Sequence, residues 1–238
     1  MPYTYFKRQW LLVVFCLSLV GVGFLIHTTQ KPKEDGLSYQ ERVDTLSTRP
    51  PASHHNYPGA LGAGAKAPNF SLKDHHGQTY NLKNALAKGP VVLTFFRGNW
   101  CPLCAAHLAK IETIQTELST LGAQSVAISA QTPEKTAQTQ SNFGITFPVL
   151  SDEQMRVTKA YGVDWEIPQK EREKFSAWLD KTTSHKLNHY QNTEAYTLPV
   201  PATYVIAPSG DIVYAHVDEN YKNRAEPELI LQALRRIK

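Results

Sequence analysis

Cysteine is scarce in this chain of 238 residues, which contains only three. Because there is only one Cys-x-x-Cys pair, the sequence lacks the four-ligand set typical of a structural zinc site. Runs rich in lysine and arginine are also absent, although the formal net charge is +4, so we expect no binding to nucleic acid. No Gly-x-Ser-x-Gly sequence occurs, which argues against a serine hydrolase of that kind. These absences direct attention to the cysteine pair.

Cys101 and Cys104 enclose Pro-Leu and follow, after RGNW at 97–100, an apolar run at residues 91–96 that predicts a buried strand. Pro102 suits the first position of a helix, where a missing N–H needs no partner. At a helix N-terminus the thiolate is stabilised by the helix dipole and by free N–H groups. A fall in thiol pKa from about 8.5 to about 7 raises the thiolate fraction at pH 7 from a few per cent to about half. The pattern predicts a redox-active dithiol.

An apolar segment at residues 10–27 follows a short N-terminal tail, residues 1–9, that contains Lys7 and Arg8. Its uncharged part is at the lower length limit for crossing a bilayer. Basic residues favour the cytoplasmic side of a membrane. We therefore predict a single transmembrane helix with the rest of the chain on the extracytoplasmic, periplasmic side.

A cleaved signal peptide is the alternative interpretation of this segment. The run is long for a signal core, and residues 24–28 offer no small-x-small cleavage site. The bulky Phe15 before Cys16 also argues against lipoprotein processing. These features favour an uncleaved anchor.

Residues 28–64 are predicted to be a linker, because they are polar and include Pro-rich pieces that act as semi-rigid spacers. Residues 65–238 are predicted to form one globular domain in which strands and helices alternate. The predicted strands cover residues 67–72, 79–82, 91–96, 124–130, 147–150, 202–206 and 211–216. The predicted helices cover residues 102–121, 132–144, 152–161, 168–190 and 227–237. This order indicates an α/β sandwich around a mixed sheet.

Several segments of this domain carry a family resemblance. They are APNFSL at 67–72, Gly77, FF at 95–96, WCPLC at 100–104, LPVPATYVI at 198–206 and YKNRAEP at 221–227. Together they resemble the alkyl hydroperoxide reductase/thiol-specific antioxidant family, the peroxiredoxin-like branch of the thioredoxin fold, and its Arg-Gly-x-Trp-Cys-Pro-x-Cys subgroup. The resemblance covers about residues 65–238 and implies a thioredoxin-like three-layer sandwich with a mixed central sheet.

The resemblance implies a thiol peroxidase that needs no cofactor or metal, and the predicted N-terminal helix would anchor it in a membrane. One thiolate attacks a hydroperoxide and becomes a sulfenic acid, and the second thiol condenses with it to a disulfide. Cys16 lies in the apolar segment and cannot reach the site, so no distant resolving cysteine exists. A thioredoxin-like dithiol donor is then expected to reduce the disulfide.

Two alignments disagree about which cysteine attacks the peroxide. The peroxiredoxin signature, aligned on the end of the strand, places Cys104 at the peroxidatic position. The arrangement in thioredoxins instead makes Cys101 the nucleophile, because in that fold the more N-terminal thiol of the pair is usually the more exposed one. Both assignments stay open at this point.

Three further residues complete the candidate catalytic set. Pro201 resembles the cis proline that faces the active cysteine in the thioredoxin fold; the alternative is that it only starts a strand. Peroxiredoxins carry a peroxide-orienting arginine at this place, so Arg97 is expected to supply that charge unless it is a solvated surface residue. Trp100 either shields the pair from water or packs in the core.

Two other functions use the same cysteine pair. One is thiol–disulfide exchange with protein partners. The other is a copper chaperone, since Cys101, Cys104 and His107 share a helical face and thiolates suit Cu(I). Further histidines follow at His185, His189 and His216. Against this, His107 is expected to be a surface residue, and His185 and His189 to lie one turn apart on a polar helix.

Overall fold

The computed structural model describes residues 52–193 and 195–237. The predicted membrane anchor, Cys16 and residues 28–51 of the predicted linker lie outside this part of the chain. Among the described residues, no helix has both the length and the apolar character needed to cross a membrane.

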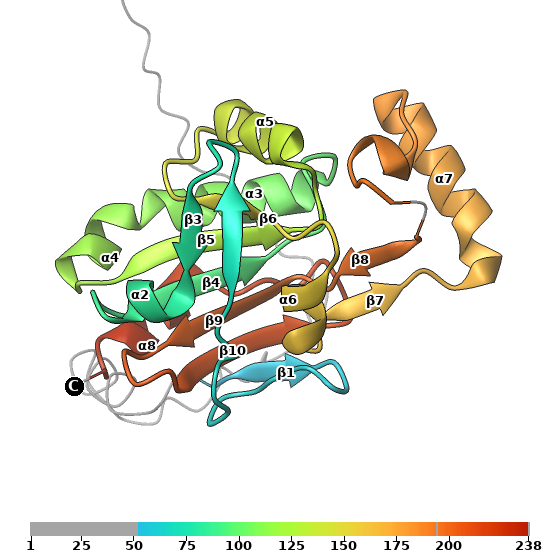
Figure 1. Ribbon diagram of the computed structural model, residues 1–238. Coiled ribbons are helices and arrows are strands. Elements are labelled where there is room, and N and C mark those ends of the chain that lie inside the picture. Colours follow the sequence, from blue (N-terminus) through green and yellow to red (C-terminus); the bar gives the residue numbers. More distant parts are fainter. Residues whose placement is uncertain (1–51, 194, 238) are drawn as a thin grey trace, which may run out of the picture. The chain divides into compact units, whose positions relative to one another are not determined.

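The described residues form a mixed β-sheet with helices on both faces (Figure 1). In chain order the elements are β1 (His54–Asn56), β2 (Ser71–Asp74), β3 (Thr79–Asn81), α2 (Leu82–Leu86), β4 (Val91–Phe95), α3 (Pro102–Thr113), α4 (Gln115–Thr120), β5 (Gln124–Ser129), α5 (Pro133–Phe143), β6 (Val149–Ser151), α6 (Arg156–Ala160), β7 (Asp164–Glu166), α7 (Gln169–Thr183), the 3-10 helix η1 (Leu187–His189), β8 (Thr197–Pro199), β9 (Ala202–Ile206), β10 (Ile212–Asp218) and α8 (Pro227–Leu234). The main sheet has the strand order β1-β10-β9-β4-β5-β6-β2-β3, and β7 pairs with β8 in a separate ribbon.

Strand β4 lies between β5 and β9, and the loop that follows it leads to the cysteine pair. It is parallel to β5 and antiparallel to β9, with Leu93 opposite Val126 on one side and Tyr204 on the other. β6 continues the parallel set beside β5, whereas β10 is antiparallel to β9. The prediction of a mixed sheet is therefore confirmed.

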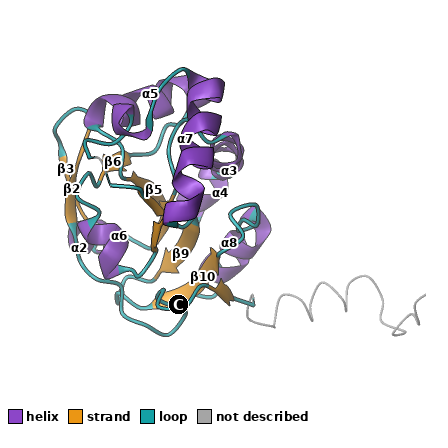
Figure 2. Cartoon of the chain, turned by 90° about the vertical axis from the view of Figure 1, so that its right-hand side faces the viewer, coloured by secondary structure: helices purple, strands orange, loops and turns teal. Residues whose placement is uncertain are grey.

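The two faces of the sheet bury different cores. Val92 is buried in one core together with Leu108 of α3. Leu93 is buried in the other core with Leu86 of α2 and Val157 of α6. Successive residues of a strand point to opposite faces of the sheet, so an uninterrupted apolar run contributes side chains to both cores. Figure 2 shows α3, α4 and α8 on one side of the sheet and α2 and α6 on the other, which gives three layers.

Residues 52–64 differ from the expectation of a linker, because they pack on the domain. β1 pairs in parallel with β10. Farther along, the Leu61 N–H donates to the Tyr161 carbonyl at 3.0 Å, and the Gly64 N–H donates to the Ile212 carbonyl at 2.8 Å. The segment thus pairs with backbone N–H and C=O groups of β10 that would otherwise stay unpaired at the edge of the sheet.

The helix predicted at 102–121 is broken into α3 and α4 at Ile114, whose φ of −104° and ψ of 12° are not helical. The Gln115 side chain explains the break. Its Nε2 donates to the Ile111 carbonyl at 3.0 Å and to Ser125 Oγ at 3.0 Å. In a continuous α-helix the Gln115 backbone N–H would donate to this same carbonyl.

The helix predicted at 152–161 is shorter than expected, because α6 begins only at Arg156. Asp152 is buried ahead of it, and its carboxylate accepts hydrogen bonds from the Thr158 N–H and hydroxyl, each at 2.8 Å. The aspartate therefore anchors the start of the helix from outside it.

The predicted helix at 168–190 is also divided. α7 ends at Thr183, its C-cap Ser184 has a left-handed φ of 60°, and η1 follows. Together they form an insertion between β7 and β8, seen at the right of Figure 1. This insertion brings α7 to the cysteine pair.

Candidate active site

The turn from β4 into α3 sets the position of both thiols. Cys101 is the N-cap of α3 with extended backbone, and Pro102 is the first helical residue. The Cys101 carbonyl accepts the N–H groups of Cys104 at 3.0 Å and Ala105 at 3.1 Å. Cys104 therefore lies in the first turn of the helix, as the third residue of α3. Both cysteines are buried and unbridged.

The loop before Cys101 is held by a buried glutamine, Gln131, in the segment that follows β5. Gln131 is fully buried, and its Oε1 accepts the Asn99 N–H at 2.9 Å. Gly98 permits the tight path, because a Cβ at this position would collide with the indole of Trp100. Two local constraints thus fix the residues that precede the thiol.

The pKa of Cys101 is lowered from its ordinary value of 9.0 to about 6. A hydrogen bond from the Cys104 thiol contributes most, and burial opposes it. The charge of Arg97, the Cys104 backbone N–H and the charge of Arg224 then add to the lowering. With this pKa, about nine-tenths of Cys101 is thiolate at pH 7.

Cys104 is shifted in the opposite direction. Burial raises the pKa of its thiol well above the ordinary value, and the hydrogen bond and negative charge of Cys101 raise it further. Arg224 opposes this effect, with its Nη2 at 3.9 Å from Cys104 Sγ. Two neighbouring groups with displaced pKa values form one thiolate and one thiol, as a nucleophile and its hydrogen-bond donor require.

Arg97 is packed between two aromatic rings. Its guanidinium carbon lies 4.9 Å from the ring centre of Trp100 and 4.6 Å from that of Tyr221. Such cation–π contacts hold an arginine in place while leaving its N–H groups available to a ligand. Arg97 is therefore not a freely solvated side chain.

A cavity of about 660 Å³ opens beside Cys101. Arg97 and Cys101 both line it, so these two predicted site residues are brought together, whereas Cys104 is not among the described residues that line it. The rest of the lining is largely apolar. Of the four large apolar side chains that are exposed in the described part of the chain, three belong to this cavity: Leu103, Trp178 and Tyr221.

Trp100 packs in the core beside this cavity, with 5% of its surface exposed. Its ring makes edge contacts with Phe175 and Trp178 of α7, at centroid distances of 5.7 and 6.0 Å. The core-packing alternative for Trp100 is thus confirmed, and the same ring supports Arg97.

Pro201 corrects one expectation. No peptide bond among the described residues is cis, so the expectation of a cis bond before Pro201 is wrong. The preceding Val200 N–H donates to the Val163 carbonyl at 2.7 Å, which carries the β7–β8 pairing onward with an ordinary trans bond. Pro201 lines a smaller cavity of about 300 Å³ together with Arg97 and Tyr221, and so lies near the site.

The histidines also differ from expectation. His107 is buried, not on the surface, because Thr203 of β9 covers it and accepts or donates a hydrogen bond with its Nε2 at 3.1 Å. His185 and His189 lie after α7 and in η1, where their rings stack at 3.7 Å. Within residues 52–193 and 195–237, no group of three or more His, Cys, Asp or Glu side chains is placed to hold a metal ion.

Comparison with known proteins identifies the family. The sequence matches the AhpC/TSA family over residues 63–215, more than half of its length. The chain belongs to the AhpC/TSA family. This confirms the resemblance found in the sequence and places the cysteine pair inside the matched region.

Two curated relatives of this AhpC/TSA protein represent different redox enzymes. Thiol-disulfide oxidoreductase ResA of Halalkalibacterium halodurans is 34% identical over 102 residues, which cover 42% of this chain and 57% of ResA. Chloroplastic peroxiredoxin Q of Triticum aestivum is 26% identical over 170 residues, which cover 71% of this chain and 63% of that protein. Each alignment spans less than two thirds of the relative.

A solved structure supports the fold. Peroxidoxin BcpB from Mycobacterium tuberculosis superimposes with a TM-score of 0.59 at 22% identity, covering 75% of this chain and 99% of BcpB. At this identity the likeness concerns the fold alone, and it agrees with a thioredoxin-like mixed sheet between helices.

Some residues of this AhpC/TSA site escape sequence reasoning. Arg224 contacts Cys104 across 120 positions of chain, and Tyr221 stacks on Arg97. Both lie in the segment YKNRAEP, whose family resemblance indicates no role for either residue. Gln131 follows a predicted strand and carries no local signal of its contact with Asn99.

Proposed function

We propose that this protein is a thiol peroxidase in which Cys101 attacks the hydroperoxide and Cys104 resolves the product. The observation that carries this proposal is the opposite displacement of the two thiol pKa values, with the thiolate at the cavity. Of the two assignments left open by the sequence, it favours Cys101 as the nucleophile.

In the first step the Cys101 thiolate attacks the terminal oxygen of the hydroperoxide. An S–O bond forms, the O–O bond breaks, and the departing alkoxide takes up a proton to leave as an alcohol or as water. The sulfur is oxidised by two electrons and becomes a sulfenic acid. Arg97, which lines the same cavity, stabilises the negative charge that develops on the peroxide oxygens.

In the second step Cys104 attacks the sulfenic sulfur of Cys101. An S–S bond forms, the S–O bond breaks, and the hydroxyl leaves as water with the proton lost by Cys104. The contact between Arg224 and Cys104 favours ionisation of this otherwise buried thiol. Because the pair spans the first turn of α3, the disulfide closes between adjacent groups.

The disulfide is then reduced by an external dithiol of the thioredoxin type. Cys101 is the sulfur at the cavity, so it is the one that an incoming thiolate attacks, and Cys104 is the leaving group. The exposed apolar side chains Leu103, Trp178 and Tyr221 surround that entrance. They also favour organic hydroperoxides over hydrogen peroxide as substrates, because apolar substituents gain from burial there.

A second candidate function is thiol–disulfide exchange with protein substrates. It is favoured by the similarity to ResA, which is named as a thiol-disulfide oxidoreductase. The same cysteine pair serves it, since a Cys101 thiolate attacks a protein disulfide by the same displacement chemistry.

We further propose that residues 10–27 anchor the protein in a membrane with its domain on the extracytoplasmic side. The apolar segment and the preceding Lys7 and Arg8 support this. Alkaline extraction of membranes from cells that make the full chain tests it: an integral anchor keeps the protein in the pellet, and release into the supernatant contradicts it.

Parallel turnover assays separate the two redox functions. The full-length protein is supplied with thioredoxin and its reducing system, and with either cumene hydroperoxide or a disulfide-bonded protein such as insulin. The peroxidase proposal predicts hydroperoxide consumption that Cys101→Ser and Cys104→Ser each abolish. Insulin reduction faster than that given by thioredoxin and its reducing system alone, without hydroperoxide consumption, would contradict it and support the second candidate.

A further inference from the structure

A second cavity, of about 450 Å³, lies next to the thiol site. Leu103 lines both cavities, and Arg224, which contacts Cys104, lines this one. Its wall is unusual in composition, since three imidazoles and three cationic side chains face it: His54, His107, His216, Lys110, Lys222 and Arg224.

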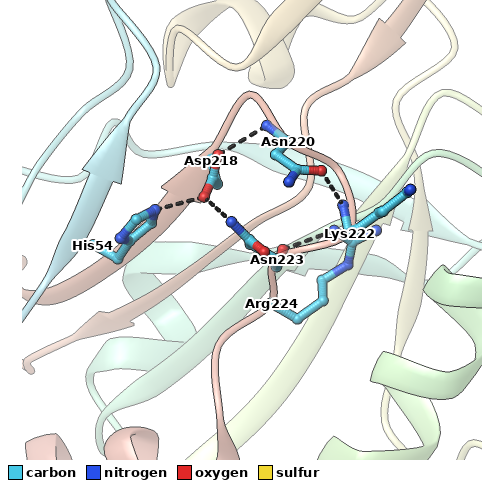
Figure 3. A network of polar contacts seen from close by, with 6 residues as sticks. All are labelled: His54, Asp218, Asn220, Lys222, Asn223 and Arg224. Atoms are coloured by element: carbon cyan, nitrogen blue, oxygen red, sulfur yellow. Dashed lines mark hydrogen bonds and ion pairs between the residues drawn. The ribbon is translucent and has the colours of Figure 1, made fainter.

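A buried aspartate behind the wall, Asp218, contacts His54 and the loop that carries Lys222 and Arg224 (Figure 3). Asp218 is 2% exposed and is not one of the described residues that line the cavity. It accepts hydrogen bonds from the Asn220 N–H at 2.8 Å and the Asn223 side chain, and contacts His54 Nε2 at 2.6 Å. The Asp218 carboxylate is thus hydrogen-bonded within the wall, and the loop that presents Arg224 is preorganised.

The charge that faces the cavity is positive. Lys110 and Glu226 pair with each other at 3.3 Å, which cancels one charge of each sign. Lys222 has no ion pair or side-chain hydrogen bond among the described residues. Arg224 donates from Nη1 to the Asn223 carbonyl at 2.8 Å and from Nη2 toward Cys104, which leaves part of its five-donor fork for a ligand.

Two buried nitrogen atoms at this cavity lack partners. His107 is 4% exposed and His216 is 9% exposed, and both line the cavity. Neither His107 Nδ1 nor His216 Nε2 has a hydrogen-bond partner in the described part of the chain. A buried polar atom without a partner is destabilising, so two of them beside one cationic cavity indicate a polar ligand.

We propose that this cavity binds the oxyanion group of a small anionic ligand, a carboxylate or a phosphate. Lys222 and Arg224 supply the charge. His107 supplies a hydrogen bond: when the Thr203 hydroxyl donates to its Nε2, its Nδ1 carries the hydrogen and donates to an anion oxygen. His216 extends the polar lining beside it.

The site acts on the cysteine pair through Arg224. The charge of Arg224 lowers the pKa of Cys101 and opposes the raised pKa of Cys104. An oxyanion bound to this guanidinium offsets that charge, so its binding raises the pKa of Cys101. The inference goes beyond peroxide reduction, because the binding itself requires no turnover.

Isothermal titration calorimetry on the reduced full-length protein tests the site, at low salt and in a buffer without other oxyanions. The probes are inorganic phosphate, glutarate and the uncharged analogue glutaramide. We expect saturable one-site binding of phosphate or of glutarate, which identifies the preferred oxyanion, and none of glutaramide. Lys222→Gln, at an exposed side chain, should weaken this binding at least about tenfold.

Lys159→Gln is the matched control, because it removes the same charge from an exposed position of α6 on the opposite face of the sheet. It should leave the affinity unchanged. Absence of saturable binding by both anions overturns the proposal, as does equal loss of affinity in the two variants. Thiolate absorbance at 240 nm provides a second readout: an unchanged Cys101 pKa at saturation excludes contact with Arg224 and overturns the placement.

Discussion

Replacing Cys104 with alanine should raise the pKa of Cys101 from about 6 to between about 7 and about 8. The hydrogen bond from the Cys104 thiol is the largest contribution to the low pKa of Cys101. Hydrogen bonds to charged groups contribute about 1.5–3 kcal/mol, and about 1.4 kcal/mol corresponds to one pH unit. At pH 7 the thiolate fraction of Cys101 should therefore fall to about half or less.

The assay is a titration of thiolate absorbance at 240 nm in the reduced protein, repeated by measuring the rate of iodoacetamide alkylation against pH. Cys104→Ser is the matched control, because its hydroxyl still donates a hydrogen bond to the Cys101 thiolate. Its Cys101 pKa should stay closer to that of the parent protein than the pKa of Cys104→Ala does.

One result would refute this reasoning. If Cys104→Ala leaves the Cys101 pKa near 6 while Arg97→Gln raises it strongly, charge and not the thiol hydrogen bond controls the nucleophile. Arg97 is the larger of the two arginine contributions, so Arg97→Gln should raise the pKa by less than Cys104→Ala does.

Three further substitutions have defined outcomes. Gln131→Leu deprives the Asn99 N–H of its partner and should lower the free energy of unfolding by about 1–3 kcal/mol in urea denaturation; an unchanged midpoint would contradict this. Arg224→Gln removes the charge that opposes the raised pKa of Cys104 and should slow closure of the disulfide about tenfold in quenched-flow alkylation of the remaining thiols. Trp178→Ala should reduce the rate with cumene hydroperoxide about fivefold and leave the rate with hydrogen peroxide unchanged; equal losses would exclude an apolar substrate contact.

Local signals in the sequence predict the elements that carry the thiols. The apolar run before Cys101, Pro102 at the helix start and Gly144 at the left-handed end of α5 are all decided by nearby residues. Departures occur where a side chain competes with the backbone. Gln115 breaks the helix at Ile114 by binding the Ile111 carbonyl, and periodicity gives no sign of such a contact.

The electrostatic part of the site depends on contacts that periodicity cannot reveal. Arg224 lies in the loop after β10, and this loop brings it to Cys104 at the start of α3. The contact of Asp218 with His54 and the pairing of β1 with β10 hold the start of that loop. His107 has the spacing of a surface position, yet Thr203 of β9 covers it. The sequence therefore predicts the dithiol and its family, whereas the order of attack depends on residues that only the folded chain brings together.

Stopped-flow reaction of the reduced full-length protein with cumene hydroperoxide, from pH 5 to pH 8, tests the central claim most directly. Because the Cys101 pKa is about 6, the second-order rate constant should rise with pH through about 6 and then level off as thiolate formation is completed. It should exceed that of free cysteine, persist in Cys104→Ser and vanish in Cys101→Ser. A rate no faster than free cysteine, or one that survives in Cys101→Ser and vanishes in Cys104→Ser, would contradict Cys101 as the peroxide-attacking thiolate.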